Sequence, residues 1–238
     1  MMLTIEGLTK RYGTKTAVDH LSLHIKPGEI YGFIGHNGAG KTTTIKSCCG
    51  ILNFDEGEIL VKGMSMKKQP LDCKKIMAYI PDNPDLYEFM RGIGYLNFIA
   101  DIYGVGQEER KERIRRYGQM FEIADDLGEL ISAYSHGMKQ KLALMSALIH
   151  EPQLLIMDEP FVGLDPKATH QVKTLMRDIC SQGGAIFFST HVLEVAEKLC
   201  DEIAIIKQGK LIKSGPTDEV IGDESLETVF LELEGDHV

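Results

Sequence analysis

The stretch Gly35–Thr42, which reads GHNGAGKT, constrains the fold of this chain more than any other part of its sequence. It fits the pattern G-x-x-x-x-G-K-[ST], and the apolar run Ile30–Ile34 comes directly before it. In this pattern the glycines let the backbone curl so that its N–H groups point at phosphate oxygens, and the following helix adds partial positive charge. The sequence therefore predicts a buried strand, a phosphate-binding loop and a helix that begins at Lys41.

The residues of this loop predict binding of a nucleoside triphosphate. The ammonium of Lys41 can reach the β- and γ-phosphates, and the hydroxyl of Thr42 can bind Mg²⁺. The residues in and directly after the loop that we expect to contact the nucleotide are Gly35, His36, Asn37, Gly38, Ala39, Gly40, Lys41, Thr42 and Thr43.

A second segment, Leu154–Pro160, reads LLIMDEP and predicts the chemistry that accompanies the loop. Its four apolar residues are typical of a buried strand, and Asp158 and Glu159 follow at the carboxyl end, where ligands of parallel sheets gather. Neighbouring carboxylates on an extended chain point in different directions. One can therefore hold a metal ion while the other polarises an attacking water.

The order of apolar runs and turn signals predicts an α/β sheet with a helical insertion. A charged, helix-like stretch from Asp82 to about Tyr134 interrupts the alternation, and we interpret Arg110–Arg116 within it as a solvated helix face. Gln208-Gly209 is typical of a hairpin turn. The expected strands are Ile30–Ile34, Glu58–Lys62, Ile76–Ile80, Leu154–Met157, Ala185–Ser189 and Ile203–Ile206, and the expected helices begin near Lys41, Ser135, Pro166 and Val192.

Composition limits the classes of partner. The chain has 238 residues, enough for one large domain or two small ones of roughly 100–200 residues. Its net charge of −9 argues against non-specific nucleic-acid binding, which needs a basic face. Five cysteines without a C-x-x-C spacing predict reduced thiols in a cytoplasmic protein.

The sequence also predicts how the chain meets a membrane. Its first residues, MMLTIEGLTKRY, lack the apolar region of a signal peptide. The longest apolar run, around Leu142–Ile149, is shorter than the roughly 18 residues that a bilayer span needs. We therefore expect any membrane role to come through a partner protein.

A third segment, Tyr134–Gln140, opens the helix that precedes the carboxylate strand. Ser135 is a natural N-cap, and the start of the helix behind it is a further site for an anion. Taken alone, the segment is explained equally well as an ordinary helix start.

The order and spacing of these motifs, across essentially the whole chain, resemble those of the ATP-binding subunits of ABC transporters. The resemblance identifies Walker A with Gly35–Thr43, Walker B with Leu154–Asp158 and the signature motif with Ser135, His136, Gly137 and Met138. It implies that Glu159 is the catalytic base, that His191 is the switch histidine and that Lys41 completes the catalytic set. It further implies that Tyr12 stacks on adenine and that Asp165 belongs to the D-loop.

The resemblance implies a P-loop NTPase (RecA-like) core with an N-terminal antiparallel β subdomain and an inserted helical subdomain. The whole chain, 1–238, would be a single ABC ATPase domain, with approximately 1–81 and 150–238 as core and approximately 82–149 as the helical subdomain. Two such subunits, identical or different, would hold Mg-ATP between them head to tail. Hydrolysis would drive transport through separate transmembrane permease subunits, and the resemblance is greatest to subunits of export systems. The chain itself would lie at the cytoplasmic face of the membrane.

Three positions depart from the family pattern. Met138 replaces the signature glutamine and His136 replaces a glycine, which leaves Ser135 and Gly137 as the matching pair. Asp82 stands where the family usually has glutamine. It is either a loop carboxylate that favours the turn or an oxygen ligand for Mg²⁺, beside Thr42 and Asp158.

The apolar residues that follow Asp82, within Asn83–Met90, suit either a surface for a partner protein or burial among the helices.

Other protein classes fit less well. Soluble ABC-type ATPases of DNA maintenance carry long coiled-coil insertions and those of translation usually carry two ATPase units, and this chain has neither feature. A P-loop GTPase would need a guanine-reading Asn-Lys-x-Asp, which is absent. A protein that only binds nucleotide would not need both Glu159 and His191.

Overall fold

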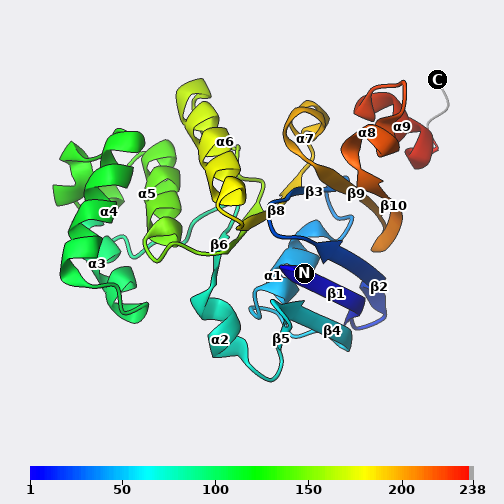
Figure 1. Cartoon of the computed structure of the whole chain (residues 1–238), viewed down its shortest axis with the longest axis horizontal. Helices are drawn as coiled ribbons and strands as arrows, with labels where there is room; N and C mark the ends of the chain where they lie inside the picture. The colour runs from blue at the N-terminus through cyan, green and yellow to red at the C-terminus, as the bar shows by residue number, and fades with distance from the viewer. Residues whose placement is uncertain (236–238) are drawn as a thin grey trace.

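The computed structural model describes residues 1–235. A six-stranded sheet with the order β10-β9-β3-β8-β7-β6 forms the centre of the molecule (Figure 1). Every neighbouring pair in it is parallel except β9 and β10, which are antiparallel. Its strands are β3 (Ile30–Ile34), β6 (Met77–Ile80), β7 (Leu154–Asp158), β8 (Ala185–Thr190), β9 (Glu202–Lys207) and β10 (Lys210–Pro216).

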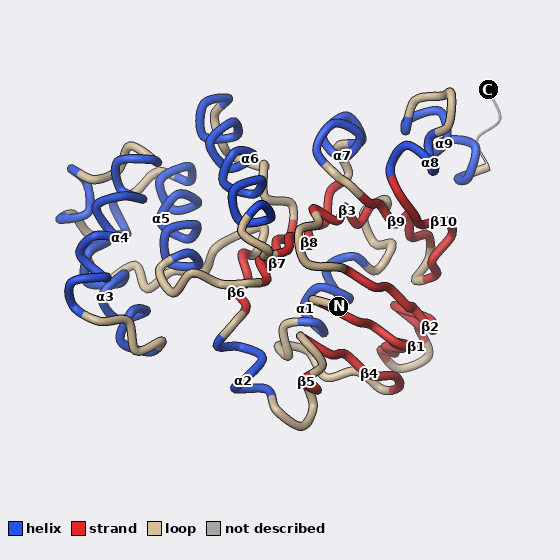
Figure 2. Tube along the Cα trace, in the orientation of Figure 1, coloured by secondary structure: helices blue, strands red, loops and turns tan. Residues whose placement is uncertain are grey.

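A second, antiparallel sheet has the order β2-β1-β4-β5 and lies on one side of the first (Figure 2). Its strands are β1 (Leu3–Tyr12), β2 (Lys15–Ile25), β4 (Glu56–Val61) and β5 (Met64–Ser65). In β2 the apolar residues Leu21, Leu23 and Ile25 alternate with polar neighbours, and all three are buried. This alternation gives the sheet one buried face, whereas β3, β7 and β8 are apolar runs buried along their whole length.

The helices cover both faces of the central sheet. Helix α1 packs between the two sheets, and α6 and α7 cover the opposite face. The helices are α1 (Lys41–Cys48), α2 (Pro70–Lys75), α3 (Gly92–Ile102), α4 (Gln107–Met120), α5 (His136–Leu148), α6 (Pro166–Ser181), α7 (Leu193–Leu199), α8 (Thr217–Ile221) and α9 (Leu226–Glu234).

Helices α3, α4 and α5 lie together at one end of the molecule, drawn in green in Figure 1. Buried side chains such as Leu96, Phe121 and Leu142 hold them against one another, and α5 also packs on β6. Because α5 contacts the edge strand of the central sheet, the start of α5 lies within reach of loops from that sheet.

The architecture confirms the α/β fold expected from the sequence, and each expected strand and helix start lies at or within two residues of an observed one. The hairpin at Gln208-Gly209 joins β9 to β10, and both residues have positive φ angles, 50° and 83°. Those angles are typical of a two-residue hairpin turn. Within residues 1–235, no helix combines the length and the apolar character needed to cross a membrane.

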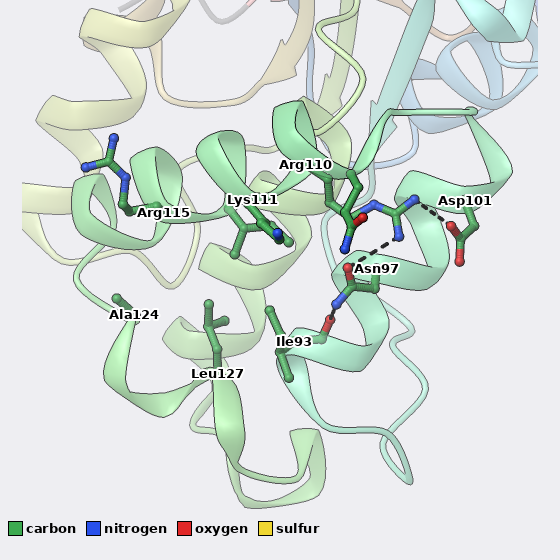
Figure 3. A pocket seen from close by; sticks show the side chains of 10 residues that line it. Ile93, Asn97, Asp101, Arg110, Lys111, Arg115, Ala124 and Leu127 are labelled. Carbon is green, nitrogen blue, oxygen red and sulfur yellow. Dashed lines mark hydrogen bonds and ion pairs between the residues drawn. The ribbon is translucent and has the colours of Figure 1, made fainter.

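The interpretation of Arg110–Arg116 as a solvated helix face is wrong for two of its arginines. The side chains of Arg110 and Arg113 are only 17% and 14% exposed. Arg110 pairs with Asp101 (Figure 3), and Arg113 binds Glu151 and the carbonyl of Ile149. A helix that packs on α3 and α5 must turn some of its dense charge inward, where ion pairs compensate it.

His150, at the end of α5, gives the fold a pH dependence. Its ring is stacked on Tyr103 with centroids 3.7 Å apart, and its Nε2 lies 3.1 Å from the carbonyl oxygen of Met77. Burial lowers the pKa of His150 below its ordinary value, and the nearby charge of Arg113 adds to this. Below about pH 6.5 the unfolded chain therefore binds a proton that the folded chain resists, so stability falls as the pH falls through that value.

We predict that His150→Phe removes part of this acid sensitivity, because phenylalanine keeps the stacked ring and cannot take up a proton. The free energy of unfolding in urea, measured at pH 7.5 and pH 5.5, should drop less in the variant than in the parent protein. His170→Phe is the control, since His170 lies exposed on α6 and its removal should leave the drop unchanged. Equal drops in the parent protein and His150→Phe would contradict the assignment.

Candidate functional site

The loop Gly35–Thr42 connects β3 to α1 and is fixed by close backbone contacts. Gly38 and Gly40 have φ angles of 82° and 112°, which side chains other than glycine rarely adopt. A Cβ atom added to Gly40 would lie 2.5 Å from the carbonyl oxygen of Ala17, and one added to Gly35 would lie 2.5 Å from that of Ile206. The loop therefore needs glycine where β2 and β9 approach it.

A cavity of about 310 Å³ opens beside this loop and brings most of the residues singled out in the sequence together. It is polar, and it is formed by the end of β1, the start of β2, the loop, the start of α1 and the ends of β6 and β7. Its lining residues are Tyr12, Lys15, Ala17, His36, Asn37, Gly38, Gly40, Lys41, Thr42, Thr43, Asp82, Asp158 and Glu159.

Lys41 lines this cavity and is 6% exposed. Its ammonium donates to the carbonyl oxygens of Gly35 and His36, at 2.6 and 3.3 Å, and lies 3.5 Å from Glu159 Oε1. These carbonyl and carboxylate oxygens compensate a nearly buried positive charge. Phosphate oxygens are the same kind of partner, and they bind an ammonium ion as strongly.

Glu159 links Lys41 to His191. Its Oε2 lies 3.0 Å from His191 Nδ1, while its Oε1 is buried and makes no hydrogen bond within the described residues. The backbone of Glu159 has a φ of 50°, in the left-handed region. Strain of this kind persists where the surrounding structure holds a residue in place, and it is frequent at functional sites.

Asp158 and Glu159 have different partners, as expected for neighbouring residues at the end of a strand. Asp158 is 3% exposed and accepts a hydrogen bond of 2.5 Å from Ser189 Oγ, which in turn accepts from the backbone N–H of Glu159 at 3.1 Å. The parallel register of β7 and β8 pairs Asp158 with Ser189 and so creates this network. The sequence did not single out Ser189, although its position at the end of an apolar strand was a usable signal.

The donors around the cavity fit a magnesium ion that also needs phosphate oxygens. Thr42 contributes a hydroxyl, and Asp82 and Asp158 contribute carboxylates, which are the oxygen ligands that Mg²⁺ prefers. In the described part of the chain, no three His, Cys, Asp or Glu side chains gather closely enough to hold a metal ion by themselves. A metal ion in this cavity would therefore take further oxygen ligands from a bound nucleotide or from water.

The residues Ser135–Met138 lie apart from this cavity, since none of them belongs to its lining. Ser135 caps α5 as expected, because its Oγ accepts from the N–H of Met138 at 3.3 Å. His136 lies against Gly163, where an added Cβ would come within 2.5 Å of the imidazole ring. Lys141 lies 3.5 Å from Asp165, so α5 contacts the segment after β7 at two points.

Asp165 is the N-cap of α6, with Pro166 at the first helical position as the sequence predicts. Its carboxylate accepts from the N–H of Ala168 at 2.8 Å, and this hydrogen bond lowers the pKa of the carboxyl group. The capping role therefore exists whatever further role Asp165 has.

Gln140 connects the start of α5 to the loop of Asp82, and the sequence did not single it out. It is 3% exposed, and its Nε2 donates to the carbonyl oxygen of Asp82 at 2.8 Å. A polar amide among buried apolar residues of an amphipathic helix was the available signal. This hydrogen bond joins the start of α5 to the backbone at the edge of the cavity.

A larger cavity, of about 680 Å³, lies between α3 and α4 (Figure 3). Two of its cationic groups are engaged within the helices, since Arg110 pairs with Asp101 and Asn97 and Lys111 pairs with Glu108. It contains no phosphate-binding loop and no pair of carboxylates like Asp158 and Glu159. The cavity beside the loop is therefore the better candidate for chemistry.

The comparisons with known proteins agree with this geometry. The family model described as "ABC transporter" matches residues 18–162. The uncharacterized ABC transporter ATP-binding protein YhcH of Bacillus subtilis (strain 168) is 35% identical over 98% of this chain and 75% of the relative. The linearmycin resistance ATP-binding protein LnrL of the same organism is 35% identical over 90% of this chain and 69% of the relative.

A solved structure, titled "Structure of ATP binding subunit of ABC transporter", aligns with a TM-score of 0.94. Its sequence is 32% identical to this chain, and the alignment covers 98% of this chain and 100% of that one. The family binds ATP. The loop, the cavity and these matches together show that the chain belongs to the ATP-binding proteins of ABC transporters.

Proposed function

We propose that this chain is the ATP-hydrolysing subunit of a transporter, in which two subunits pair head to tail and drive export through separate membrane subunits. The observation that carries the proposal is the arrangement of Lys41, Glu159 and His191 at the phosphate loop. It brings a phosphate-binding cation, a carboxylate base and an imidazole to one place, as hydrolysis of a γ-phosphate requires.

Binding of the nucleotide involves both ends of the cavity. Tyr12 is 50% exposed at its rim, so its ring can stack on adenine. At the other end the N–H groups of the loop and the ammonium of Lys41 receive the phosphates. Lys41 exchanges its contacts with Gly35, His36 and Glu159 for phosphate oxygens, so binding also releases the carboxylate of Glu159.

Glu159 then acts on water. Its Oε1 is buried and makes no hydrogen bond among the described residues, and once Lys41 turns to phosphate oxygens it is a ready acceptor for a proton of the attacking water. His191 contacts the other carboxylate oxygen at 3.0 Å and holds the water against the γ-phosphate. General-base assistance of this kind contributes about 10²–10⁴ in rate.

We assign Thr42, Asp158 and Asp82 to Mg²⁺. When bound, the ion neutralises charge on the phosphate oxygens. Asp82 is exposed on the loop after β6 and lines the cavity together with Asp158, which supports a role at the metal site rather than in the turn alone.

The position of the signature residues supports the head-to-tail dimer. Ser135, His136, Gly137 and Met138 lie outside the cavity of their own chain, which supports contact with a nucleotide bound by a second subunit. The N-terminus of α5, capped by Ser135, would then face that nucleotide's γ-phosphate. Asp165, in contact with Lys141 of α5, would lie at the same interface.

An exposed aromatic surface supports a membrane partner. Tyr87, Phe89 and Phe98 are 48%, 80% and 39% exposed, and the ring of Tyr87 lies 5.9 Å from both of the others. Contact with a partner would remove this apolar area from water. This surface comes directly after the loop of Asp82 in the chain, so a partner bound there would be connected to the nucleotide cavity through that loop.

Two further assignments belong to this proposal. The group α3–α5 at one end of the molecule supports a division into a helical subdomain, approximately 82–149, and a core formed by approximately 1–81 and 150–238. The linearmycin resistance protein among the relatives supports export as the direction of transport. In such an assembly this chain lies at the cytoplasmic face of the membrane.

We predict that Lys41→Met weakens ATP binding by about 10- to 100-fold, because a charge-assisted hydrogen bond contributes about 1.5–3 kcal/mol. Titration with a fluorescent ATP analogue measures the effect. Lys46→Met, on the same helix but outside the cavity, is the matched control and should bind normally. Equal affinity in the two variants would exclude Lys41 as a phosphate ligand.

We predict that Glu159→Gln keeps ATP binding and lowers turnover by about 10²–10⁴-fold, because glutamine preserves the shape of the side chain and removes the base. With Mg²⁺ present, an ATP-bound dimer should accumulate on a sizing column. Near-normal hydrolysis by this variant would assign the base to another residue.

We predict that Asp82→Gln raises the Mg²⁺ concentration needed for half-maximal ATP binding and half-maximal hydrolysis, with a much smaller change in the maximal rate. Glutamine offers a neutral oxygen where aspartate offers a charged one. Asp85→Asn, a nearby exposed carboxylate outside the cavity, is the control. Identical Mg²⁺ dependence in Asp82→Gln and the parent protein would leave Asp82 as a turn residue.

A further inference from the structure

Hydrogen bonds near both ends of the C-terminal helix α9 hold it beside the nucleotide site. The backbone N–H of Leu226 donates to Glu197 Oε2 of α7 at 2.9 Å. Near the other end, Lys207 at the end of β9 donates to the carbonyl oxygen of Leu233 at 3.2 Å. These contacts hold the helix to the strand that flanks β3 and to the helix that follows His191.

Phe230 connects α9 to the phosphate loop. Its side chain is 5% exposed, and its ring centroid lies 4.9 Å from that of His36, with an angle of 66° between the planes. This is the edge-to-face geometry that aromatic rings prefer. The carbonyl oxygen of His36 accepts a hydrogen bond from the ammonium of Lys41. His36 therefore contacts Phe230 through its ring and Lys41 through its backbone.

The loop is held from a second direction as well. Gly35 packs so closely on β9 that an added Cβ would lie 2.5 Å from the carbonyl oxygen of Ile206. The start of the loop therefore has a strand on one side and Phe230 on another. Loss of the phenylalanine ring would remove this aromatic contact of His36 while the contact of Gly35 with β9 remained.

A small cavity of about 250 Å³ shows that α9 faces both catalytic loops. Glu227, Phe230 and Leu231 line it from α9, Gly35–Asn37 line it from the phosphate loop, and His191 and Leu193 line it from the segment after β8. His191 lies 3.0 Å from Glu159, and Lys41 lies 3.5 Å from the same carboxylate. A displacement of α9 would therefore alter the surroundings of His191 directly and those of Lys41 through His36.

We propose that Phe230 is a positioning residue for hydrolysis: from α9 it fixes the phosphate loop relative to His191, and it touches no nucleotide. This inference rests on the ATP hydrolysis proposed above. Small misplacements of reacting groups reduce turnover strongly. Affinity is shared among several loop N–H groups, Lys41 and Tyr12 and tolerates a small shift of the loop, whereas turnover depends on its placement relative to His191, so Phe230 should affect turnover more than ATP binding.

The test compares Phe230→Ala with Val229→Ala. Val229 is the neighbouring buried residue of α9, 7% exposed, and does not line the small cavity, so it controls for lost packing. We expect Phe230→Ala to lower kcat about tenfold, equivalent to about 1.4 kcal/mol, with less than about twofold change in affinity for ATP. Phe230→Tyr, which keeps the aromatic edge, should restore most of the rate, and Val229→Ala should lower Tm while kcat stays within about twofold.

Hydrogen exchange separates this inference from the proposed function, because it does not depend on hydrolysis. With ATP bound, Phe230→Ala should speed amide exchange in residues 35–42 and 190–193, and Val229→Ala should not. If the parent protein bound ATP without hydrolysing it, the proposed function would fail and the exchange data would still decide the role of Phe230. Equal exchange, or equal loss of kcat, in the two alanine variants would overturn the positioning role.

Discussion

The rest of the site depends on the contacts that the carboxylate of Glu159 makes with Lys41 and His191. Lys41 comes from the start of α1, Glu159 from the end of β7 and His191 from the end of β8. These three side chains meet only because β3, β8 and β7 are parallel neighbours whose carboxyl ends share one edge of the sheet. The topology therefore creates the site, and local sequence supplies the groups.

The positive charge of Lys41 is compensated by oxygen atoms that phosphate oxygens can replace. A nearly buried ammonium would be costly without the carbonyl oxygens of Gly35 and His36 and the carboxylate of Glu159. Phosphate oxygens can replace these partners at little electrostatic cost. Ser189 satisfies Asp158 in the same way, so the two carboxylates keep different directions and can take different roles.

Much of the fold and the site follows from the sequence, because the decisive signals are local. Gly35–Thr42 and Leu154–Glu159 combine an apolar strand with the loop that follows it, and turn chemistry at Gln208-Gly209 predicts the hairpin. The sequence did not predict helices α8 and α9, nor the mostly buried side chains of Arg110 and Arg113. The placement of α9 and Arg113 depends on tertiary partners such as His36 and Glu151, which lie far away in the sequence, and Arg110 pairs across a turn with Asp101.

The separation of Ser135–Met138 from the cavity of their own chain is the second consequence of the architecture, because α5 belongs to the group at the far end of the central sheet. We propose that a complete site needs two chains. The most direct measurement mixes two inactive variants, Ser135→Arg and Lys41→Met, and follows ATP hydrolysis. Each mixed dimer then holds one intact composite site, so the account predicts that activity returns to about a quarter of the parent rate in an equal mixture, since half of the dimers carry one of two sites. A mixture as inactive as its components, together with loss of ATP affinity in monomeric Ser135→Arg, would contradict it.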